Sequence, residues 1–291
     1  MDDLTQRIVT ELRKDGRATF TDVAKSLGTN RDTVAARVNP LLSSGALKIF
    51  AGIHPKVLGK QVSAHLAIRI EGPLTKLLDS LASIDSMVFV SETTGSFQVV
   101  AELHTESLAK AHEAVAVVRA TPRVIEVNVH VYERIINSFF LGPEPNLSGI
   151  NLDRFDIGIM KYLQANGRAP LAEISKAVEL SVSGCRNRIN RLRSSGILKV
   201  GALKQRTDMS NDFLFGLGIN TKSGSKEVEL LLAEFLGLEF LARSIGRFDY
   251  IATMSFGSLR EFNELISRLR VLENVTYTEQ WLHVRIAYEQ Y

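Results

Sequence analysis

The chain repeats itself once, and this repeat constrains its fold more than any other feature of the sequence. Shifted by 151 positions, the 291-residue sequence matches itself without a gap. Residues 15–18 (Asp-Gly-Arg-Ala) fall on residues 166–169 (Asn-Gly-Arg-Ala), and residues 43–48 fall on residues 194–199. Each copy is about 140 residues long, which is enough to bury a core of its own. The repeat therefore predicts two similar modules in tandem and argues against a solenoid of small units.

The first third of each copy has the pattern of a small helical domain. Apolar residues recur at helical spacing in residues 4–45 and again in residues 155–196. Three helices are predicted in each copy, and the third begins at Asn30 or at Ser181, because both residue types cap helix N-termini well. A short strand follows the third helix. Pro40 lies inside the third helix of copy 1, where it removes a hydrogen bond, so we expect that helix to be bent or shortened.

The remainder of each copy alternates strands and helices. In copy 1 the predicted elements are residues 64–70, 74–84, 87–93, 97–103, 108–120 and 124–131. Their order is strand, helix, strand, strand, helix, strand, which is that of the ferredoxin-like fold. The last of these segments alternates apolar and polar residues with a period of two, which predicts a strand with one buried face.

These patterns define an α+β chain, a tandem repeat of a winged helix-turn-helix domain and a ferredoxin-like βαββαβ domain. Residues 141–151 contain two prolines and two glycines, which marks them as a linker. The predicted helix-turn-helix domains are residues 1–50 and 152–206. The predicted ferredoxin-like domains are residues 51–140 and 207–291.

Positive charge concentrates in the helical segment of copy 2. Residues 152–206 contain eleven Lys and Arg against four acids, a net charge of +7, whereas residues 208–291 carry a net charge of −4. A basic segment centred on a small helical module is the electrostatic footprint of phosphate binding. The alternative explanation is a solvated helix face without a partner.

A capped second helix after a tight turn is the pattern of the helix-turn-helix, whose recognition helix enters the major groove of double-stranded DNA. Small residues open that helix in copy 2, which favours close approach to phosphates and base edges. The DNA-binding residues predicted for copy 2 are Ser181, Ser183, Arg186, Arg188, Arg191 and Arg193. Copy 1 is the weaker reader, and its candidates are Arg31 and Arg37.

Composition excludes several classes of protein. No apolar run approaches the roughly 20 residues that a membrane helix needs, and the acidic N-terminus is not that of a secretory signal. The single cysteine, Cys185, excludes an intramolecular disulfide and is expected in the core of its module. The six histidines lack the spacing of a zinc site. We therefore expect a cytoplasmic protein with no metal and no membrane partner.

The residues of copy 2 resemble those of the leucine-responsive/asparagine regulator (Lrp/AsnC) family. Residues 180–192, followed by Ser-Gly-Ile-Leu at residues 195–198, look like the recognition helix of that family and the residues after it. Residues 152–163 resemble its first helix, and residues 167–169 resemble the turn that follows. The resemblance covers both copies and leaves out only the linker. It implies a transcriptional regulator that binds DNA, with ferredoxin-like domains that pair through their sheets and bind an amino acid or a related metabolite.

The resemblance also implies an effector site at a turn between two strands. The family pattern is a glycine followed by an aromatic residue, Asp and Tyr, and here it matches Gly246, Phe248, Asp249 and Tyr250. We expect Gly246 to permit a positive-φ turn. Asp249 then either binds a ligand ammonium group or only caps the turn. Copy 1 keeps the glycine and the aromatic residue as Gly95 and Phe97 but has Gln98 opposite Asp249. The fused copies resemble a pseudo-dimer, and association of such chains into a homo-oligomer is expected.

Two other functions remain open. The sirohaem decarboxylases resemble this family, are built from the same two-domain module and bind a tetrapyrrole, for which they need basic and histidine side chains in the cleft. The strands that we compared, residues 88–93 and 240–245, contain no histidine and one arginine. The other alternative is a ligand-sensing adaptor that binds protein. Residues 216–218 fit a strand with two glycines better than a phosphate-binding loop. We therefore expect the chain not to be an enzyme and to need no cofactor.

Overall fold

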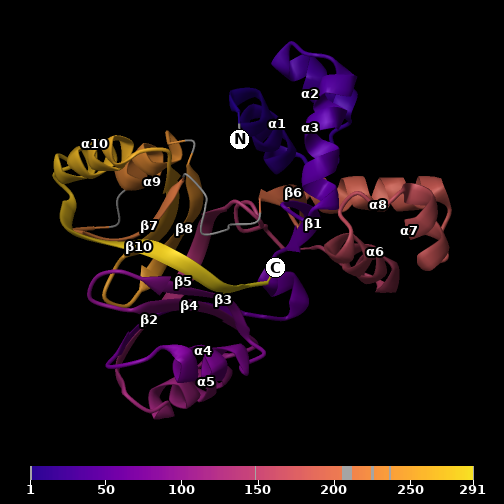
Figure 1. The fold of residues 1–291 in the computed structure, drawn as a ribbon. Coiled ribbons are helices and arrows are strands. Elements are labelled where there is room, and N and C mark those ends of the chain that lie inside the picture. Colours follow the sequence, from indigo (N-terminus) through magenta and orange to yellow (C-terminus); the bar gives the residue numbers. More distant parts are fainter. Residues whose placement is uncertain (1, 148, 205–211, 224–225, 236, 291) are drawn as a thin grey trace. The chain divides into compact units, whose positions relative to one another are not determined.

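The computed structural model describes residues 2–147, 149–204, 212–223, 226–235 and 237–290. The chain forms two compact units, each of which takes one half of both copies (Figure 1). The helix-turn-helix unit comprises residues 1–54 and 140–206, and the sheet unit comprises residues 55–139 and 207–290. The predicted α+β class, with tandem winged helix-turn-helix and ferredoxin-like domains, is confirmed.

The helix-turn-helix unit contains two modules of three helices and one strand. In copy 1 these are α1 (Asp3–Lys14), α2 (Phe20–Leu27), α3 (Arg31–Ser43) and β1 (Leu47–Ile53). In copy 2 they are α6 (Arg154–Ala165), α7 (Leu171–Ala177), α8 (Val182–Ser194) and β6 (Leu198–Lys204). Each module packs its apolar stripe inward, and Cys185 is fully buried with Ile189 and Leu192, as the sequence predicts.

The two modules are joined by their strands. β1 and β6 pair antiparallel, with Leu47 opposite Lys204 and Ile53 opposite Leu198 (Figure 1). The first helix of each copy packs against the strand of the other copy, α1 on β6 and α6 on β1. Each strand therefore packs against the first helix of the opposite module. Neither module buries its apolar residues completely without the other.

The repeated Gly-Arg dipeptide explains how closely the modules approach. A Cβ on Gly16 would lie 3.1 Å from the Gly201 backbone nitrogen of copy 2, and one on Gly167 would lie 2.9 Å from the Phe50 backbone of copy 1. The arginines that follow reach across the junction. Arg17 donates to the carbonyl oxygen of Gly167 at 2.8 Å, and Arg168 donates to the carbonyl oxygen of Ala18 at 2.9 Å. The motif that revealed the repeat is therefore a contact between the copies.

The expected shortening of the copy 1 recognition helix is wrong. α3 continues through Pro40 to Ser43 and has 13 residues, as α8 does. Pro40 lies in the last turn, and the amide of Ser44 still donates to its carbonyl oxygen at 3.0 Å. A proline at this position removes only one backbone hydrogen bond near the end of the helix, so it does not prevent the last turn from forming.

The sheet unit contains both ferredoxin-like halves. Copy 1 supplies β2 (Val62–Ile70), α4 (Thr75–Ala82), β3 (Met87–Thr93), β4 (Val99–Thr105), α5 (Leu108–Ala120) and β5 (Val124–Ser138), after a short 3₁₀ helix at Pro55–Leu58. Copy 2 supplies β7 (Phe213–Thr221), α9 (Lys226–Ala233), β8 (Leu238–Ile245), β9 (Tyr250–Phe256), α10 (Leu259–Arg270) and β10 (Val275–Glu289).

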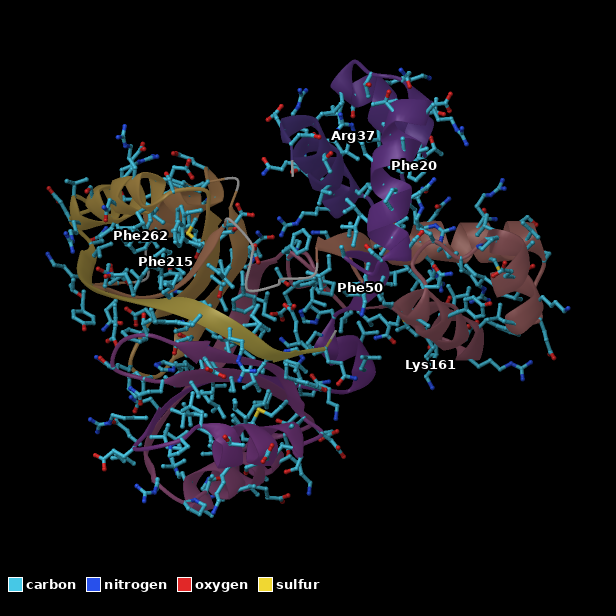
Figure 2. All side chains as sticks on the ribbon, in the orientation of Figure 1. Phe20, Arg37, Phe50, Lys161, Phe215 and Phe262 are labelled. Carbon is cyan, nitrogen blue, oxygen red and sulfur yellow. The ribbon has the colours of Figure 1, made fainter. Side chains whose placement is uncertain are left out.

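These strands close into one antiparallel sheet in the order β10-β3-β4-β2-β5-β8-β9-β7. The last strand of each copy crosses to the other copy, so β5 pairs with β8 and β10 pairs with β3. Helices cover the outer face of each half. In copy 2, for example, the Phe215 ring of β7 stacks on the Phe262 ring of α10, with centroids 3.8 Å apart (Figure 2). Each half has its own cluster of buried apolar residues between its strands and helices. A third cluster contains residues of both copies, among them Tyr132, Phe248 and Trp281.

The predicted strand at residues 124–131 is real, but it is longer than expected and both of its faces are covered. β5 continues to Ser138 because its second half pairs with β8 of the other copy. His130 is on the face that the alternation marks as polar, yet it is fully buried. Period-two alternation indicates which face of a strand is polar, but it does not indicate whether other parts of the chain cover that face.

Substitution of Glu179 by glycine should stabilise the helix-turn-helix unit. Glu179 lies between α7 and α8 with a φ of 55°, where its repeat equivalent Gly28 has a φ of 65°. A left-handed conformation costs a side chain about 1–2 kcal/mol, part of which glycine loses again in backbone entropy. We expect Glu179→Gly to raise the free energy of unfolding by about 1 kcal/mol, measured by urea denaturation. Gly28→Ala is the matched control and should lower it; a loss of stability in Glu179→Gly would contradict the strain.

Candidate nucleic-acid interface and ligand-domain sites

The recognition helix α8 begins at a well-formed cap. Ser181 has extended backbone geometry and its hydroxyl accepts a hydrogen bond from the Gly184 amide at 3.1 Å. Its hydroxyl also lies 3.1 Å from that of Ser183. Ser181 is therefore engaged in holding the start of the helix, while Ser183 stands exposed in its first turn.

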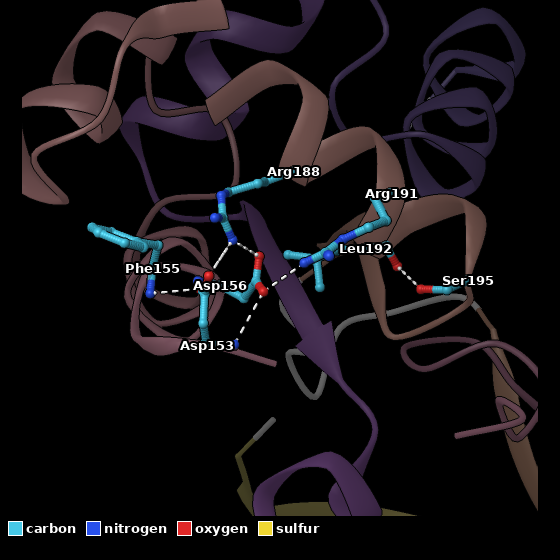
Figure 3. Close-up of polar contacts among 7 residues, drawn as sticks. All are labelled: Asp153, Phe155, Asp156, Arg188, Arg191, Leu192 and Ser195. Carbon is cyan, nitrogen blue, oxygen red and sulfur yellow. Dashed lines mark hydrogen bonds and ion pairs between the residues drawn. The ribbon is translucent and has the colours of Figure 1, made fainter. Parts of the chain in front are cut away.

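Two of the predicted DNA-binding arginines are held by carboxylates of the first helix (Figure 3). The Asp156 carboxylate is nearly fully buried, and its two oxygens accept from Arg188 at 2.9 Å and from Arg191 at 2.5 Å. Arg188 also lies 2.8 Å from Asp153, the residue that caps α6 through a capping box. The carboxylate of Asp156 raises the pKa of Arg188, so the charged pair is favoured. These contacts clamp α8 to α6.

The same clamp occurs in copy 1. Arg37, the repeat equivalent of Arg188, donates to Asp2 and, at 2.8 Å, to the Thr5 hydroxyl. The hydrogen bond from Arg37, together with the Thr5 amide, lowers the pKa of Asp2 from 3.8 to about 2. The other copy 1 candidate, Arg31, forms an ion pair with its neighbour Asp32 at 3.2 Å. Both predicted arginines of copy 1 are thus paired within the chain.

The remaining arginines of α8 differ from each other. Arg193 forms an ion pair with Asp15 of the other copy at 2.8 Å. Arg186 is exposed and makes no hydrogen bond or ion pair with any residue that the structure describes. With Ser183, Asn187 and Asn190 it forms one exposed polar stripe, because these positions recur at helical spacing. We call these four residues the α8 stripe.

In the sheet unit, the predicted effector residues hold the fold together. Gly246 does not have a positive φ, contrary to expectation, whereas Gly95 does, at 99°. Gly246 is required by close approach instead, since a Cβ there would lie 2.8 Å from the carbonyl oxygen of Val129. Phe248 and Tyr250 are buried, and Phe97 packs in the same cluster as Phe248.

Asp249 accepts hydrogen bonds at the end of β7. Its Oδ2 receives the Thr221 amide at 2.7 Å and the Thr221 hydroxyl at 3.2 Å. The repeat equivalent, Gln98, accepts from the amide of Ile70, which is the equivalent of Thr221, at 3.1 Å. Asp and Gln therefore make the same contact in the two copies, and the capping alternative fits these contacts.

Sequence reasoning missed a group of aromatic and histidine side chains buried between strands of both copies. His65 of β2 lies opposite His130 of β5, with ring centroids 5.8 Å apart. Trp281 of β10 lies 5.6 Å from the His65 ring, and Phe248 stacks on His130 at 5.2 Å. Both nitrogens of each histidine, and the indole nitrogen of Trp281, are buried without a hydrogen-bond partner in the described part of the chain.

The electrostatics of this group are unusual. Burial, followed by the neighbouring His65, lowers the pKa of His130 from 6.5 to about 3, so the ring is neutral at pH 7. Beside it, the Tyr132 hydroxyl donates to Glu102 at 2.8 Å, and burial raises the pKa of that tyrosine. A neutral imidazole offers one donor and one acceptor. The signal in the sequence was the presence of His65, Glu102 and His130 on the inner positions of paired strands.

Two glycines make room for these rings. A Cβ on Gly216 would lie 1.9 Å from the Trp281 indole nitrogen, and one on Gly218 would lie 2.5 Å from the Phe248 ring. The prediction that residues 216–218 belong to a strand is confirmed by β7.

Among the described residues, no group of three or more His, Cys, Asp or Glu side chains could hold a metal ion. No described helix is long and apolar enough to cross a membrane.

Comparison with known proteins agrees with this architecture. Residues 152–199 match the family model of a winged helix-turn-helix DNA-binding domain, and residues 1–42 match that of an AsnC-type helix-turn-helix domain. The HTH-type transcriptional regulator FL11 of Pyrococcus abyssi is 27% identical over 126 residues, 43% of this chain and 83% of that protein. The regulatory protein AsnC of Haemophilus influenzae is 29% identical over 119 residues, 40% of this chain and 79% of that protein.

The fold and the α8 clamp define a winged helix-turn-helix protein with two fused modules. More narrowly, the helix-turn-helix module of copy 1 matches the AsnC-type model, and both of these relatives, FL11 and AsnC, are regulators to which one copy of this chain is similar over most of their length.

The comparison with solved structures adds a match over nearly the whole chain. The siroheme decarboxylase NirDL covers 99% of this chain, and 93% of its own chain is covered, with a TM-score of 0.64 and 16% sequence identity. The expectation that the chain is not an enzyme is therefore wrong, because the architecture that it shares end to end is that of an enzyme. The ground for that expectation also fails. The comparison of residues 88–93 and 240–245 overlooked His65 and His130, which come from β2 and β5.

Removal of the copy 1 clamp should return the Asp2 carboxyl to its ordinary pKa. We expect Arg37→Ala to raise the pKa of Asp2 from about 2 towards 3.8, because the largest cause of the shift is the hydrogen bond from Arg37. Because this pKa is lowered by folding, the stabilisation is present above pH 3.8 and is lost as the pH falls through about 2. Carboxyl chemical shifts in an NMR pH titration measure it. Arg7→Ala is the control, and an unchanged Asp2 pKa in Arg37→Ala would contradict the clamp.

Proposed function

We propose that this chain is a sequence-specific DNA-binding transcriptional regulator that reads double-stranded DNA with copy 2. The observation that carries the proposal is the α8 stripe, in which Arg186 is exposed on a recognition helix and has no ion-pair or hydrogen-bond partner among the described residues. A guanidinium group in the major groove donates two hydrogen bonds to guanine, and asparagine side chains pair in the same manner with adenine. Arg186, Asn187 and Asn190 have the chemistry for such contacts, and the exposed Ser183 hydroxyl is able to donate a hydrogen bond to a backbone phosphate.

The clamp gives the other arginines a different role. Arg188 and Arg191 hold α8 at a fixed angle to α6, which is what a recognition helix needs if its stripe is to meet base edges in register. Arg191 remains half exposed, and Arg193 is partly exposed, so both also add positive potential for the DNA backbone. In this proposal base reading belongs to the α8 stripe, and Arg188 positions it.

Substitution of Arg186 should weaken DNA binding selectively. We expect Arg186→Ala to lower affinity for the cognate duplex by about 5- to 150-fold, the equivalent of 1–3 kcal/mol for a specific base contact. Fluorescence anisotropy against the duplex upstream of the gene and a scrambled duplex, each at several salt concentrations, measures the effect. Lys161→Ala, an exposed residue of α6 outside the stripe (Figure 2), is the control. Equal affinity of wild type and Arg186→Ala would overturn the assignment of α8.

We further propose that a small metabolite such as an amino acid regulates DNA binding, at the turns that carry Gly246 and Asp249 in copy 2 and Gly95 in copy 1. The support is the family pattern and the position of these turns beside the cluster that joins the two copies. These pseudo-dimeric chains are also proposed to form homo-oligomers, which sedimentation equilibrium tests.

A second candidate function is binding of a tetrapyrrole, with or without chemistry on it. NirDL has been solved with an iron-uroporphyrin III analogue, and the group His65, His130 and Trp281 favours the same class of ligand here. Buried polar groups without partners cost about 1–3 kcal/mol each. Flat rings of Phe248 and Trp281 beside these donors suit a planar ligand that carries hydrogen-bond acceptors.

One pair of variants separates the two ligand proposals. His130→Phe keeps an aromatic ring against Phe248 but removes both nitrogens, so it should abolish a shift in the absorbance spectrum of iron uroporphyrin III and leave the melting temperature unchanged or higher. Asp249→Asn keeps an acceptor for Thr221 but removes the charge that an ammonium group needs. It should abolish only a rise in melting temperature with amino acids.

His112→Ala, on the exposed face of α5, is the control for both measurements. Tetrapyrrole binding that survives in His130→Phe would contradict the interior group as the site. An amino-acid effect that survives in Asp249→Asn would contradict the turn as the effector site.

A further inference from the structure

The two recognition helices share their internal contacts but differ on their outer faces. Both helices have 13 residues, begin at a side-chain cap and are clamped by an arginine to the first helix. Their inward positions are apolar in both copies. Val34 and Val38 of α3 are buried, as are their repeat equivalents Cys185 and Ile189 of α8.

The outward positions of α3 lack most of the side chains that could donate hydrogen bonds to base edges of DNA. Three positions of the α8 stripe are changed, since Asp32 replaces Ser183, Ala35 replaces Arg186 and Ala36 replaces Asn187. Only Asn39, the equivalent of Asn190, is kept. Alanine offers no hydrogen bond to a base edge, so two central positions of this face cannot read a sequence.

Charge on α3 also opposes contact with DNA. The Asp32 side chain is 92% exposed in the first turn, where a phosphate would approach the helix N-terminus. Arg31 pairs with Asp32 and Arg37 pairs with Asp2, so each arginine of α3 has a carboxylate partner. A carboxylate in the first turn stabilises a helix, but it repels the anionic backbone of DNA.

Copy 1 is nevertheless held firmly in place. β1 and β6 form seven paired positions, and Arg17 and Arg168 reach across to the opposite turn. Asp15 of copy 1 also pairs with Arg193 at the end of α8. The copy 1 module thus supports the copy 2 module through contacts that do not involve its outer face.

We infer that each chain reads DNA through α8 alone and that the copy 1 module is a structural support for it. This inference rests on the proposed function and deepens it. The DNA partner of one chain is then a duplex with a single half-site, and a two-fold symmetric operator requires two chains. In this respect the fused protein differs from a dimer of identical subunits, which presents two equal recognition helices.

Two matched variants test the inference. Ala36→Glu and Asn187→Glu place the same charge at repeat-equivalent, exposed positions of α3 and α8. We expect Asn187→Glu to lower affinity for the selected duplex at least about tenfold, as loss of a base contact does, and Ala36→Glu to change it less than about twofold. Both positions are exposed, so both variants should fold, which thermal melting checks.

The full chain is first used to select duplexes from a random pool, and the two variants are then titrated with the selected duplex. Enrichment of one half-site, with loss of affinity only in Asn187→Glu, supports the inference. Equal loss in Ala36→Glu and Asn187→Glu overturns it while leaving the DNA-binding function in place. Failure of the wild-type chain to enrich any sequence overturns the proposed function and the inference together.

Discussion

The structure depends on the completion of each copy by the other. β5 continues into the half-sheet of copy 2 and β10 continues into that of copy 1, so each half-sheet has its edge covered by a strand from the other copy. In the helix-turn-helix unit, β1 and β6 form a two-stranded sheet to which each copy gives one strand. Unpaired sheet edges are costly and prone to association. A chain that carries both copies satisfies them internally, and fusion guarantees that the two partners are always present together.

The clamp shows why a charge count overstates a nucleic-acid interface. The segment 152–206 has a net charge of +7, but Arg188 and Arg191 share the buried carboxylate of Asp156, and Arg193 is paired with Asp15 from the other copy. A buried carboxylate needs such partners, because an unpaired charge inside a protein is strongly destabilising. Part of the positive charge thus serves to build the module. In the proposed function, the part that remains for DNA is the α8 stripe, which would act through geometry and hydrogen bonding more than through net charge.

The sequence is sufficient for the architecture and insufficient for the sites. Periodicity and the 151-residue offset predict the helices, the strands and the ferredoxin-like order, because these features depend on local pattern. The partners of Arg188 lie 32 and 35 residues away, and no local pattern reveals them. His130 looks like a solvent-facing residue of an alternating strand, and only the second half-sheet makes it buried. The role expected for Gly246 is wrong for a similar reason. Glycine is needed there because the backbone of Val129, in a strand of the other copy, lies too close for a side chain, and not because of the conformation of its own turn.

In both units, the two copies agree at positions that maintain the fold and differ at other positions. Positions that maintain the fold keep either the residue, as with Gly16 and Gly167, or the contact, as with Gln98 and Asp249, which accept from equivalent backbone amides. Outward positions of the recognition helices differ, as with Ala35 and Arg186. The buried group of the sheet unit behaves like the second class, because His65 and His130 have Gly216 and Trp281 as their repeat equivalents. A purely structural interior would tolerate symmetric apolar residues at these positions at lower cost. The buried imidazoles of one copy, with the rings and glycines of the other copy arranged around them, are therefore the observation on which the proposed tetrapyrrole site rests.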